Sequence, residues 1–320
     1  MNVLHRLESF PDRQCPVFLA LGCFDGLHVG HRAVLGIALS RARETAGEAW
    51  AFAFSPHPAK VLDPDRAPAL ICTLAQQERL LQETGMDGLL LQHFTKPFMH
   101  QTPETFFDRL LDAVPGLAGL SVGADWSFGK DRAGTPERMA ALCAERNLFF
   151  SAHPPVLIDG ARVSSTRIRQ AVAEGRMAEA RTLLGRPFSV VGTVVHGERI
   201  GRTLGFPTAN VTPENELLPA RGIYAARVRV GRRIHPAAAY VGRRESFRKD
   251  GPQVLEAHLL EQPEIDLYDK RIEIEYLDFV RNDRRFDDPE ALKRQIRADL
   301  ERIDAILRRE SRAEEPASLT

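Results

Sequence analysis

An apolar run that breaks into a glycine-rich turn is the feature of this sequence that most restricts its fold. Residues 17–21 read VFLAL without a polar interruption, which is typical of a strand buried on both faces of a parallel sheet. The following turn carries three glycines and two histidines: Gly22, Gly26, Gly30, His28 and His31. If a helix begins near residue 29, its unpaired N–H groups and positive dipole end face this turn. The stretch therefore predicts an anion-binding site.

Short apolar runs alternate with helical patterns from residue 17 to about residue 150. The expected strands are 17–21, 50–54, 88–92 and 117–122. The expected helices are 31–45, 74–84, 103–113 and 136–146, followed by 167–173 and 177–184. This alternation predicts an α/β domain with a doubly wound parallel sheet over residues 1–185.

The pattern changes after Pro187. Five strand-like segments follow without helices between them: 188–195, 222–230, 234–241, 254–260 and 271–279. They predict a small antiparallel β-barrel or sandwich over residues 186–308. Its last element is a helix at 289–308 with an apolar stripe that we expect to pack on the barrel: Leu292, Ile296, Leu300, Ile303 and Leu307. Residues 309–320 are expected to be a disordered tail.

Composition narrows the class of protein. Lysine plus arginine and aspartate plus glutamate both number 43, so the net charge is zero and a nucleic-acid partner is not expected. No run approaches the roughly 20 apolar residues of a membrane helix, so no membrane partner is expected. The four cysteines are scattered without a CxxC pair, which favours reduced thiols and a soluble, cytoplasmic protein.

The histidine pair alone has three interpretations. The two rings could bind zinc, although zinc needs three or four ligands and no third is evident nearby. They could be ordinary polar residues at a helix start. The order of strand, glycine turn, histidines and helix start favours the third interpretation, which is phosphate binding.

Four segments of the first domain, taken in order, resemble the FMN adenylyltransferase module of the bacterial bifunctional riboflavin kinase/FAD synthetases. They are FDGLHVGH at 24–31, FSPHP at 54–58, VGADWSFGKDRAG at 122–134 and VSSTRIR at 163–169. The resemblance implies a Rossmann-like nucleotidyltransferase fold with the HxGH signature. The chain departs from the family pattern at Cys23, where asparagine is usual.

This resemblance also implies roles for individual residues. His28 and His31 would be catalytic, and FMN would attack the α-phosphate of ATP, with Mg²⁺ present and pyrophosphate leaving. The ATP-binding residues implied here are Gly22, Phe24, Asp25, Gly26, Gly30, Ser164, Ser165, Thr166 and Arg167. Those implied for flavin binding are His57, Asp125, Phe128, Arg132 and Arg169.

The string GRTLGFPTAN at 201–210 carries the chemistry expected of the second domain. It is too irregular for a plain strand and suggests a loop leading onto one, which could be a structural barrel corner. With PARGIYAARV at 219–228 and LEAHLL at 255–260, it resembles the riboflavin kinase module of the same family. The resemblance implies ATP binding by Gly201, Thr208 and Asn210, with Mg²⁺ on the last two.

Glu256 would be the base that accepts a proton from the ribityl hydroxyl of riboflavin. The other interpretation of Glu256 is a strand carboxylate that faces water. The chain departs from the family pattern at residues 244–247, where it reads RESF, and at Asp269, where glycine is usual.

The expected function is therefore conversion of riboflavin to FMN and of FMN to FAD, with riboflavin, FMN, FAD and ATP as partners. Three alternatives stay open. The chain could be an FMN adenylyltransferase with a degenerate kinase module, a nucleotidyltransferase for another phosphorylated substrate, or a non-catalytic flavin-binding sensor. The sequence gives no oligomeric state.

Overall fold

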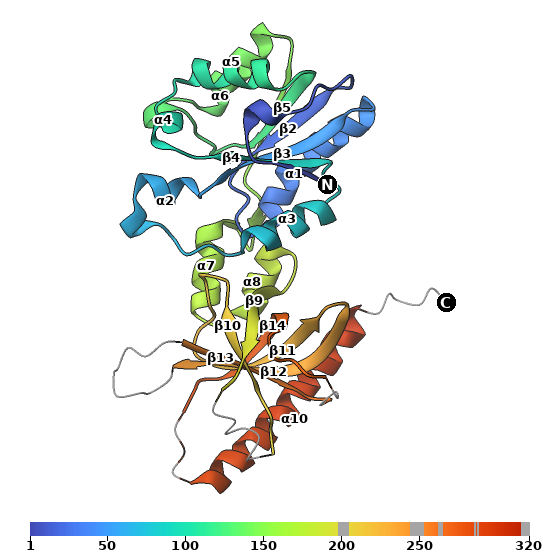
Figure 1. Ribbon diagram of the computed structural model, residues 1–320, viewed down its shortest axis with the longest axis vertical. Coiled ribbons are helices and arrows are strands. Elements are labelled where there is room, and N and C mark those ends of the chain that lie inside the picture. The colour runs from blue at the N-terminus through green and yellow to red at the C-terminus, as the bar shows by residue number, and fades with distance from the viewer. Residues whose placement is uncertain (198–204, 244–252, 262–264, 285, 287, 315–320) are drawn as a thin grey trace. The chain divides into compact units, whose positions relative to one another are not determined.

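The chain forms two compact units (Figure 1). The computed structural model describes residues 1–197, 205–243, 253–261, 265–284, 286 and 288–314. The first unit is Met1–Ala69 with Leu74–Ser165, and the second is Leu70–Thr73 with Thr166–Thr320. The second unit thus begins before residue 186 and contains helix α8 (Met177–Leu184), because α8 packs against strands β9 and β14.

The first unit is built on a six-stranded parallel sheet in the order β1-β4-β3-β2-β5-β6. Its strands are β1 (Asn2–Leu4), β2 (Val17–Leu21), β3 (Glu48–Ser55), β4 (Gly88–His93), β5 (Leu117–Gly123) and β6 (Phe149–His153). The four strands expected from the sequence are present. The two edge strands were missed because β1 has only three residues and the residues of β6 are all half-buried, so neither gives a continuous apolar signal.

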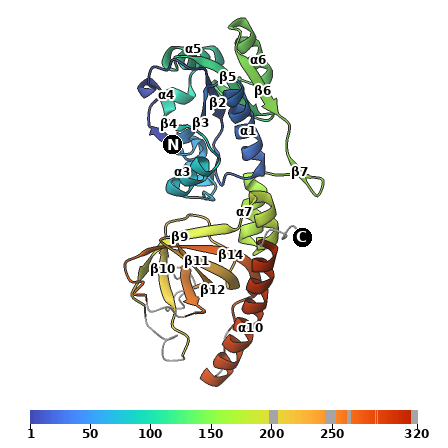
Figure 2. The same cartoon turned by 90° about the vertical axis from the view of Figure 1, so that its right-hand side faces the viewer.

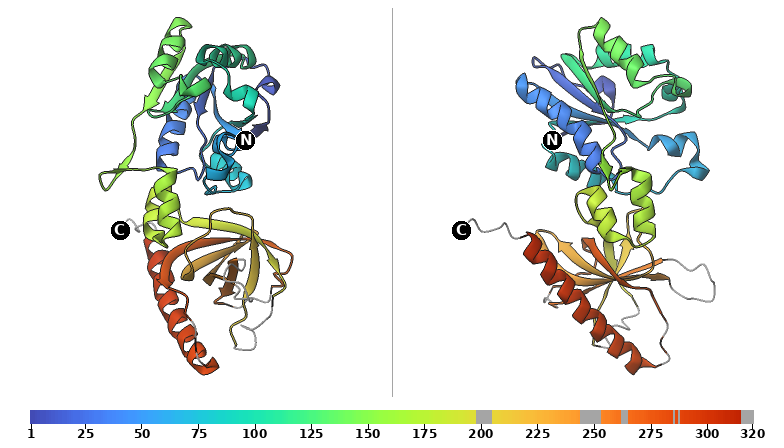
Figure 3. Two further views of the ribbon diagram at one scale, coloured as in Figure 1. Left: turned by 90° about the vertical axis from the view of Figure 1, so that its left-hand side faces the viewer. Right: turned by 180° about the vertical axis from the view of Figure 1, so that it is seen from behind.

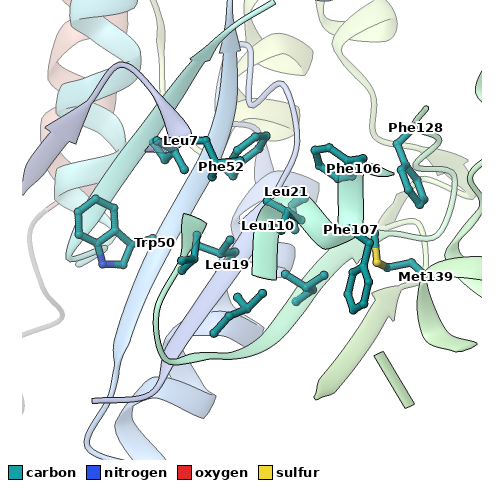
Figure 4. Packing of buried hydrophobic residues seen from close by; sticks show 14 of the residues in the cluster. Leu7, Leu19, Leu21, Trp50, Phe52, Phe106, Phe107, Leu110, Phe128 and Met139 are labelled. Carbon is teal, nitrogen blue, oxygen red and sulfur yellow. The ribbon is translucent and has the colours of Figure 1, made fainter. Parts of the chain in front are cut away.

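Helices cover both faces of this sheet (Figure 3). They are α1 (Val29–Glu44), α2 (Pro58–Leu62), α3 (Leu74–Glu83), α4 (Lys96–Met99), α5 (Pro103–Ala113) and α6 (Pro136–Glu145). Alternate residues of β2 enter different cores: Leu19 packs on the side of α5 and α6, and Phe18 on the side of α1. Figure 4 shows the first of these cores, with Trp50 and Phe106 among its aromatic side chains. The expectation that residues 17–21 are buried on both faces is confirmed.

The second unit contains a closed antiparallel barrel of six strands in the order β10-β13-β12-β11-β14-β9. The strands are β9 (Phe188–Val195), β10 (Ala209–Pro213), β11 (Gly222–Val230), β12 (Arg233–Arg243), β13 (Gln253–Leu259) and β14 (Arg271–Arg281). The expected loop leads onto a strand at Ala209. Helix α7 (Ser165–Ala173) and α8 precede the barrel in the chain.

Helix α10 (Pro289–Glu314) lies along the barrel (Figure 2). Ile303, Ile306 and Leu307 pack on the barrel side chains Leu277 and Val280. The expectation of a disordered tail from residue 309 is wrong for its first six residues, which continue the helix. Here Glu310 pairs with Arg181 of α8, and the Ser311 hydroxyl donates to the Leu307 carbonyl.

Shorter elements complete the two units. They are the 3₁₀ helices η1 (Leu7–Ser9), η2 (Pro64–Arg66) and η3 (Lys130–Arg132) and the two-stranded hairpin β7 (Leu157–Ile158) and β8 (Ala161–Arg162). Among the described helices, none combines the length and apolar character needed to cross a membrane.

The packing of β3 against β4 gives a test of the first unit. Gly88 lies opposite Trp50, and a Cβ at Gly88 would be 2.2 Å from the indole ring. Because Trp50 is fully buried and cannot move aside, we expect Gly88→Ala to lower the free energy of unfolding by about 3 kcal/mol. Denaturant unfolding of the purified protein measures this change.

Gly36→Ala is the matched control. Gly36 is an exposed residue of α1, and a Cβ there would have no neighbour within 4 Å. The same substitution should then stabilise the first unit by roughly 0.5–1 kcal/mol, because alanine has the higher helix propensity. Equal effects of the two variants would contradict the described packing of β3 on β4.

Candidate functional site

The turn after β2 is held in a left-handed conformation that is uncommon for side-chain-bearing residues. Phe24, Gly26 and Leu27 have φ angles of 51°, 78° and 40°. Phe24 and Leu27 are both buried, so their packing holds this backbone conformation in place. From outside the turn, the Gln77 side chain donates to the Cys23 carbonyl at 2.8 Å. The turn is thus a fixed loop rather than a loose connection.

His28 and His31 form a stacked pair at the start of α1. Nδ1 of His28 accepts the backbone N–H of His31 at 3.2 Å, so His28 is the N-cap of the helix. With Nδ1 as acceptor, the neutral ring carries its proton on Nε2, which is then a donor. The ring centroids lie 3.5 Å apart at an interplanar angle of 17°. A Cβ at Gly30 would be 3.2 Å from the His28 ring, so glycine there leaves room for it.

One hydrogen bond joins the turn to a distant stretch of the first unit. The Ser165 hydroxyl donates to the Asp25 carbonyl at 3.2 Å, although the two residues are 140 positions apart. Seven predicted residues lie in the turn and the first turn of α1: Gly22, Phe24, Asp25, Gly26, His28, Gly30 and His31. The structure therefore brings Ser165, with Ser164 next to it, to the predicted anion site.

The remaining predicted residues of α7 belong to the second unit. Thr166 is exposed, and Arg169 is half-buried. Nε of Arg167 lies 2.8 Å from the Glu179 carboxylate of α8, in a half-buried ion pair. Arg167 is therefore already engaged within its own unit.

Three of the residues predicted for flavin binding share the loop after β5. Asp125 pairs with Arg162 of β8, and Nε of Arg132 donates to the Ser127 hydroxyl at 2.8 Å. Phe128 is buried and stacks on Trp126, with ring centroids 4.3 Å apart. His57 lies elsewhere, as the N-cap of α2, where its Nδ1 accepts the Ala59 N–H at 3.2 Å. Arg162 was missed by the sequence analysis although it precedes the VSSTRIR string by one residue.

In the second unit, neighbouring strands place Asn210, Glu256 and Tyr240 side by side. Glu256 of β13 is paired in register with Asn210 of β10 on one side and with Tyr240 of β12 on the other. Directly paired residues of adjacent strands project from the same face of the sheet. The Thr208 hydroxyl donates to the Glu256 carboxylate at 2.9 Å. Three of the predicted kinase residues are therefore adjacent.

Three members of this group, Thr208, Tyr240 and Glu256, line a pocket of about 460 Å³ on the barrel face that α10 covers. The helix supplies one wall through Leu292, Ile296, Leu300 and Ile303. The sequence analysis expected the whole apolar stripe of α10 to pack on the barrel. Only its C-terminal half does so, and the half-buried residues of the N-terminal half line the pocket instead.

Several polar residues of the pocket were missed because nothing in the sequence pattern marks them. The Tyr240 hydroxyl donates to the Asp283 carboxylate at 2.8 Å. Arg281 of β14 binds Asp299 of α10 through two nitrogens, with its Nη2 at 2.7 Å. Burial, the bond to Asp283 and the charges of Asp283 and Glu256 raise the pKa of Tyr240 well above its ordinary value. Tyr240 is therefore a neutral hydrogen-bond donor at physiological pH.

The donor atoms around Glu256 suit a hard cation. Thr208, Asn210 and Glu256 offer hydroxyl, amide and carboxylate oxygens, which are the ligands that Mg²⁺ prefers. A Cβ at Gly197 would be 2.2 Å from the Asn210 amide, so glycine leaves space for that side chain. Among the described residues there is no group of three histidine, cysteine, aspartate or glutamate side chains that could hold a metal.

The departures from the expected family pattern fall partly outside the described residues. Residues 244–247 lie outside them, and so does Gly201, which was predicted to bind ATP. Asp269 has a φ angle of 60°, the left-handed region that glycine occupies freely and aspartate tolerates. The backbone there has the conformation that a glycine would favour, despite the substitution.

Comparison with known proteins assigns a family to both units. The family model described as FAD synthetase matches residues 10–167, and the model described as riboflavin kinase matches residues 184–307. Two curated relatives, both named bifunctional riboflavin kinase/FMN adenylyltransferase, cover nearly the whole chain. The one from Escherichia coli K12 is 35% identical over 92% of this chain and 94% of its own. The one from Pseudomonas fluorescens is 36% identical over 94% and 96%.

A solved structure is similar over most of its length as well. The crystal structure titled macrolide-efflux protein from Streptococcus pneumoniae has a TM-score of 0.85 and 31% identity, covering 93% of this chain and 97% of that one. The fold, both family models and the curated relatives agree. The chain belongs to the bifunctional riboflavin kinase/FMN adenylyltransferase family.

Proposed function

We propose that the two reactions of the family are divided between the two constellations described above. As a member of this family, the chain converts riboflavin to FMN and FMN to FAD, with ATP as the second substrate of both reactions. The turn with His28 and His31 carries the adenylyl transfer. The barrel face around Glu256 carries the kinase reaction. The observation that carries this division is that each unit holds its own cluster of predicted residues.

In the first unit, the fixed turn and the N-terminus of α1 bind the phosphates of ATP. The Nε2–H of His28 and the ring of His31 stabilise the charge that develops when FMN attacks the α-phosphate and pyrophosphate leaves. Ser165, whose hydroxyl donates to the Asp25 carbonyl, offers a further polar group of the first unit beside these phosphates. Asp125, Phe128 and Arg132 receive FMN from their shared loop. No side chain acts as a covalent nucleophile.

In the second unit, riboflavin occupies the pocket between the barrel and α10. Its mostly apolar walls suit a flat aromatic ring system. Glu256 accepts the proton of the ribityl hydroxyl as that oxygen attacks the γ-phosphate of ATP. The hydrogen bond from Thr208 orients the carboxylate for this transfer. This arrangement favours an active kinase module over the degenerate one considered from the sequence.

Thr208 and Asn210 would hold Mg²⁺ together with the phosphates of ATP. The ion would neutralise charge on the transferring phosphoryl group. The remaining steps depend on the chain itself: Asn210 and Thr208 position the phosphates, and Glu256 moves the proton.

Loss of either histidine should affect one reaction only. We expect His28→Ala or His31→Ala to slow FAD formation from FMN by about 100-fold, because each removes a group that stabilises transition-state charge. Riboflavin phosphorylation should stay within twofold of wild type, as measured by chromatography of the flavin products. His100→Ala is the control, because His100 is an exposed residue that follows α4. Unchanged adenylyl transfer in both histidine variants would remove the turn from the mechanism.

Glu256→Gln should have the opposite effect. The amide keeps the size of the side chain and an oxygen that can accept the Thr208 hydrogen bond, but it cannot accept a proton, so we expect FMN formation to fall at least 100-fold. FAD formation from added FMN should be unaffected. Glu261→Gln, an exposed position just beyond β13, is the matched control. A Glu256→Gln enzyme that still phosphorylates riboflavin would show that another group is the base.

A further inference from the structure

A short segment at the end of β14 and just after it lines the pocket of the second unit with residues that are partly or fully exposed to solvent. We call this the mouth segment; its described residues are Arg281, Asn282, Asp283, Arg284 and Phe286. Two of its bonds reach α10: Arg281 binds Asp299, and Arg284 donates to Gln295. A third bond, from Tyr240 to Asp283, reaches strand β12 of the barrel. The segment is thus tied to both walls of the pocket.

The position of the mouth segment determines the shape of the pocket. Arg281, Asp283, Arg284 and Phe286 all line it. The Arg284 guanidinium lies 4.7 Å from the centre of the Phe286 ring and that of Arg281 lies 5.8 Å from it, both within the range of cation–π attraction. Any shift of the segment therefore also shifts an aromatic wall of the pocket.

Tyr240 is built to make the bond on the barrel side. A Cβ at position 242 would lie only 2.0 Å from the Tyr240 hydroxyl. Glycine at this position therefore leaves the space that the Tyr240 side chain occupies. Asp283 is exposed, and no basic side chain of the described chain forms an ion pair with it. Among the described residues, the Tyr240 hydroxyl is thus the group that holds the Asp283 carboxylate in place.

We propose that Tyr240 is a positioning residue of the flavin pocket: through Asp283, its hydroxyl holds the mouth segment over bound riboflavin. This inference rests on the proposed assignment of the pocket to flavin. Tyr240 takes no part in proton or phosphoryl transfer, which depend on Glu256, Thr208 and Asn210. Loss of the bond therefore weakens flavin binding and leaves the chemical step intact.

Tyr240→Phe removes the hydroxyl and keeps the ring. We expect the KM for riboflavin to rise about 5- to 10-fold, the loss expected for one hydrogen bond to a charged acceptor, while kcat stays within twofold. The dissociation constant for riboflavin, measured by flavin fluorescence, should rise by the same factor. Tyr224→Phe is the matched control: its hydroxyl donates to the Ala220 carbonyl and the residue does not line the pocket. That control should leave the KM unchanged.

Variants of Asp283 separate positioning from a direct contact with the ligand. Asp283→Asn keeps an oxygen that can accept from Tyr240, so the KM should stay within about twofold of wild type. Asp283→Ala should match Tyr240→Phe, and the double variant should be no worse than either single one, because both remove one shared bond. If Asn is as damaging as Ala, the carboxylate charge acts on the ligand and the positioning role is wrong.

The remaining outcomes are equally distinct. A Tyr240→Phe enzyme with active kinase chemistry and an unchanged riboflavin KM overturns the inference and leaves the proposed function intact. Normal phosphorylation by Glu256→Gln would instead contradict the assignment of the kinase site itself. FAD formation from FMN serves as an internal control in the Tyr240 and Asp283 variants, and a loss there would indicate damage beyond the pocket.

Discussion

Cross-strand register is the constraint on which the second unit depends. One transverse row of the closed barrel contains Asn210, Glu256, Tyr240, Ile223 and Arg281, each paired with the next. Because side chains alternate between the two faces of a strand, a slip of one residue would turn Glu256 into the barrel interior. Closure of the barrel resists such a slip, since each strand is paired on both sides. Backbone pairing thus sets the positions of the proposed kinase residues, and side-chain hydrogen bonds such as that from Thr208 to Glu256 then orient them.

In the first unit, the candidate site residues are held in position by a different kind of interaction. The residues that we propose for adenylyl transfer lie in one short turn and at the start of α1, and buried Phe24 and Leu27 hold that turn in a left-handed conformation. Strand β2, which leads into the turn, is itself fixed because each of its two faces packs against a separate hydrophobic core. Local strain and core packing replace long-range register as the source of order. Mutations that disturb core packing around the turn should therefore damage the first unit, whereas mutations that disturb strand pairing should damage the second.

The sequence predicted most of this architecture because its strongest signals are local. Continuous apolar runs mark the central strands, and proline and glycine mark the bounds of α5 and α8. Edge strands such as β6 escaped because their residues are only half-buried. The candidate site residues that the sequence predicted lie in contiguous strings, such as the turn before α1. Tyr240, Asp283 and Arg281 could not be found in this way, because only the pairing of distant strands and the docking of α10 bring them to one pocket.

The divided apolar stripe of α10 has a thermodynamic consequence. Its C-terminal half is covered by the barrel, while Leu292, Ile296 and Leu300 face the pocket and are only half-buried. Under the proposed assignment, a flavin ring in that pocket would cover these side chains and add to the apolar core of the second unit. By mass action, ligand that binds only the folded state stabilises it in proportion to the logarithm of its concentration. On that assignment, riboflavin is both the substrate of the second unit and a source of its stability, so the free energy of unfolding of that unit rises with the riboflavin concentration.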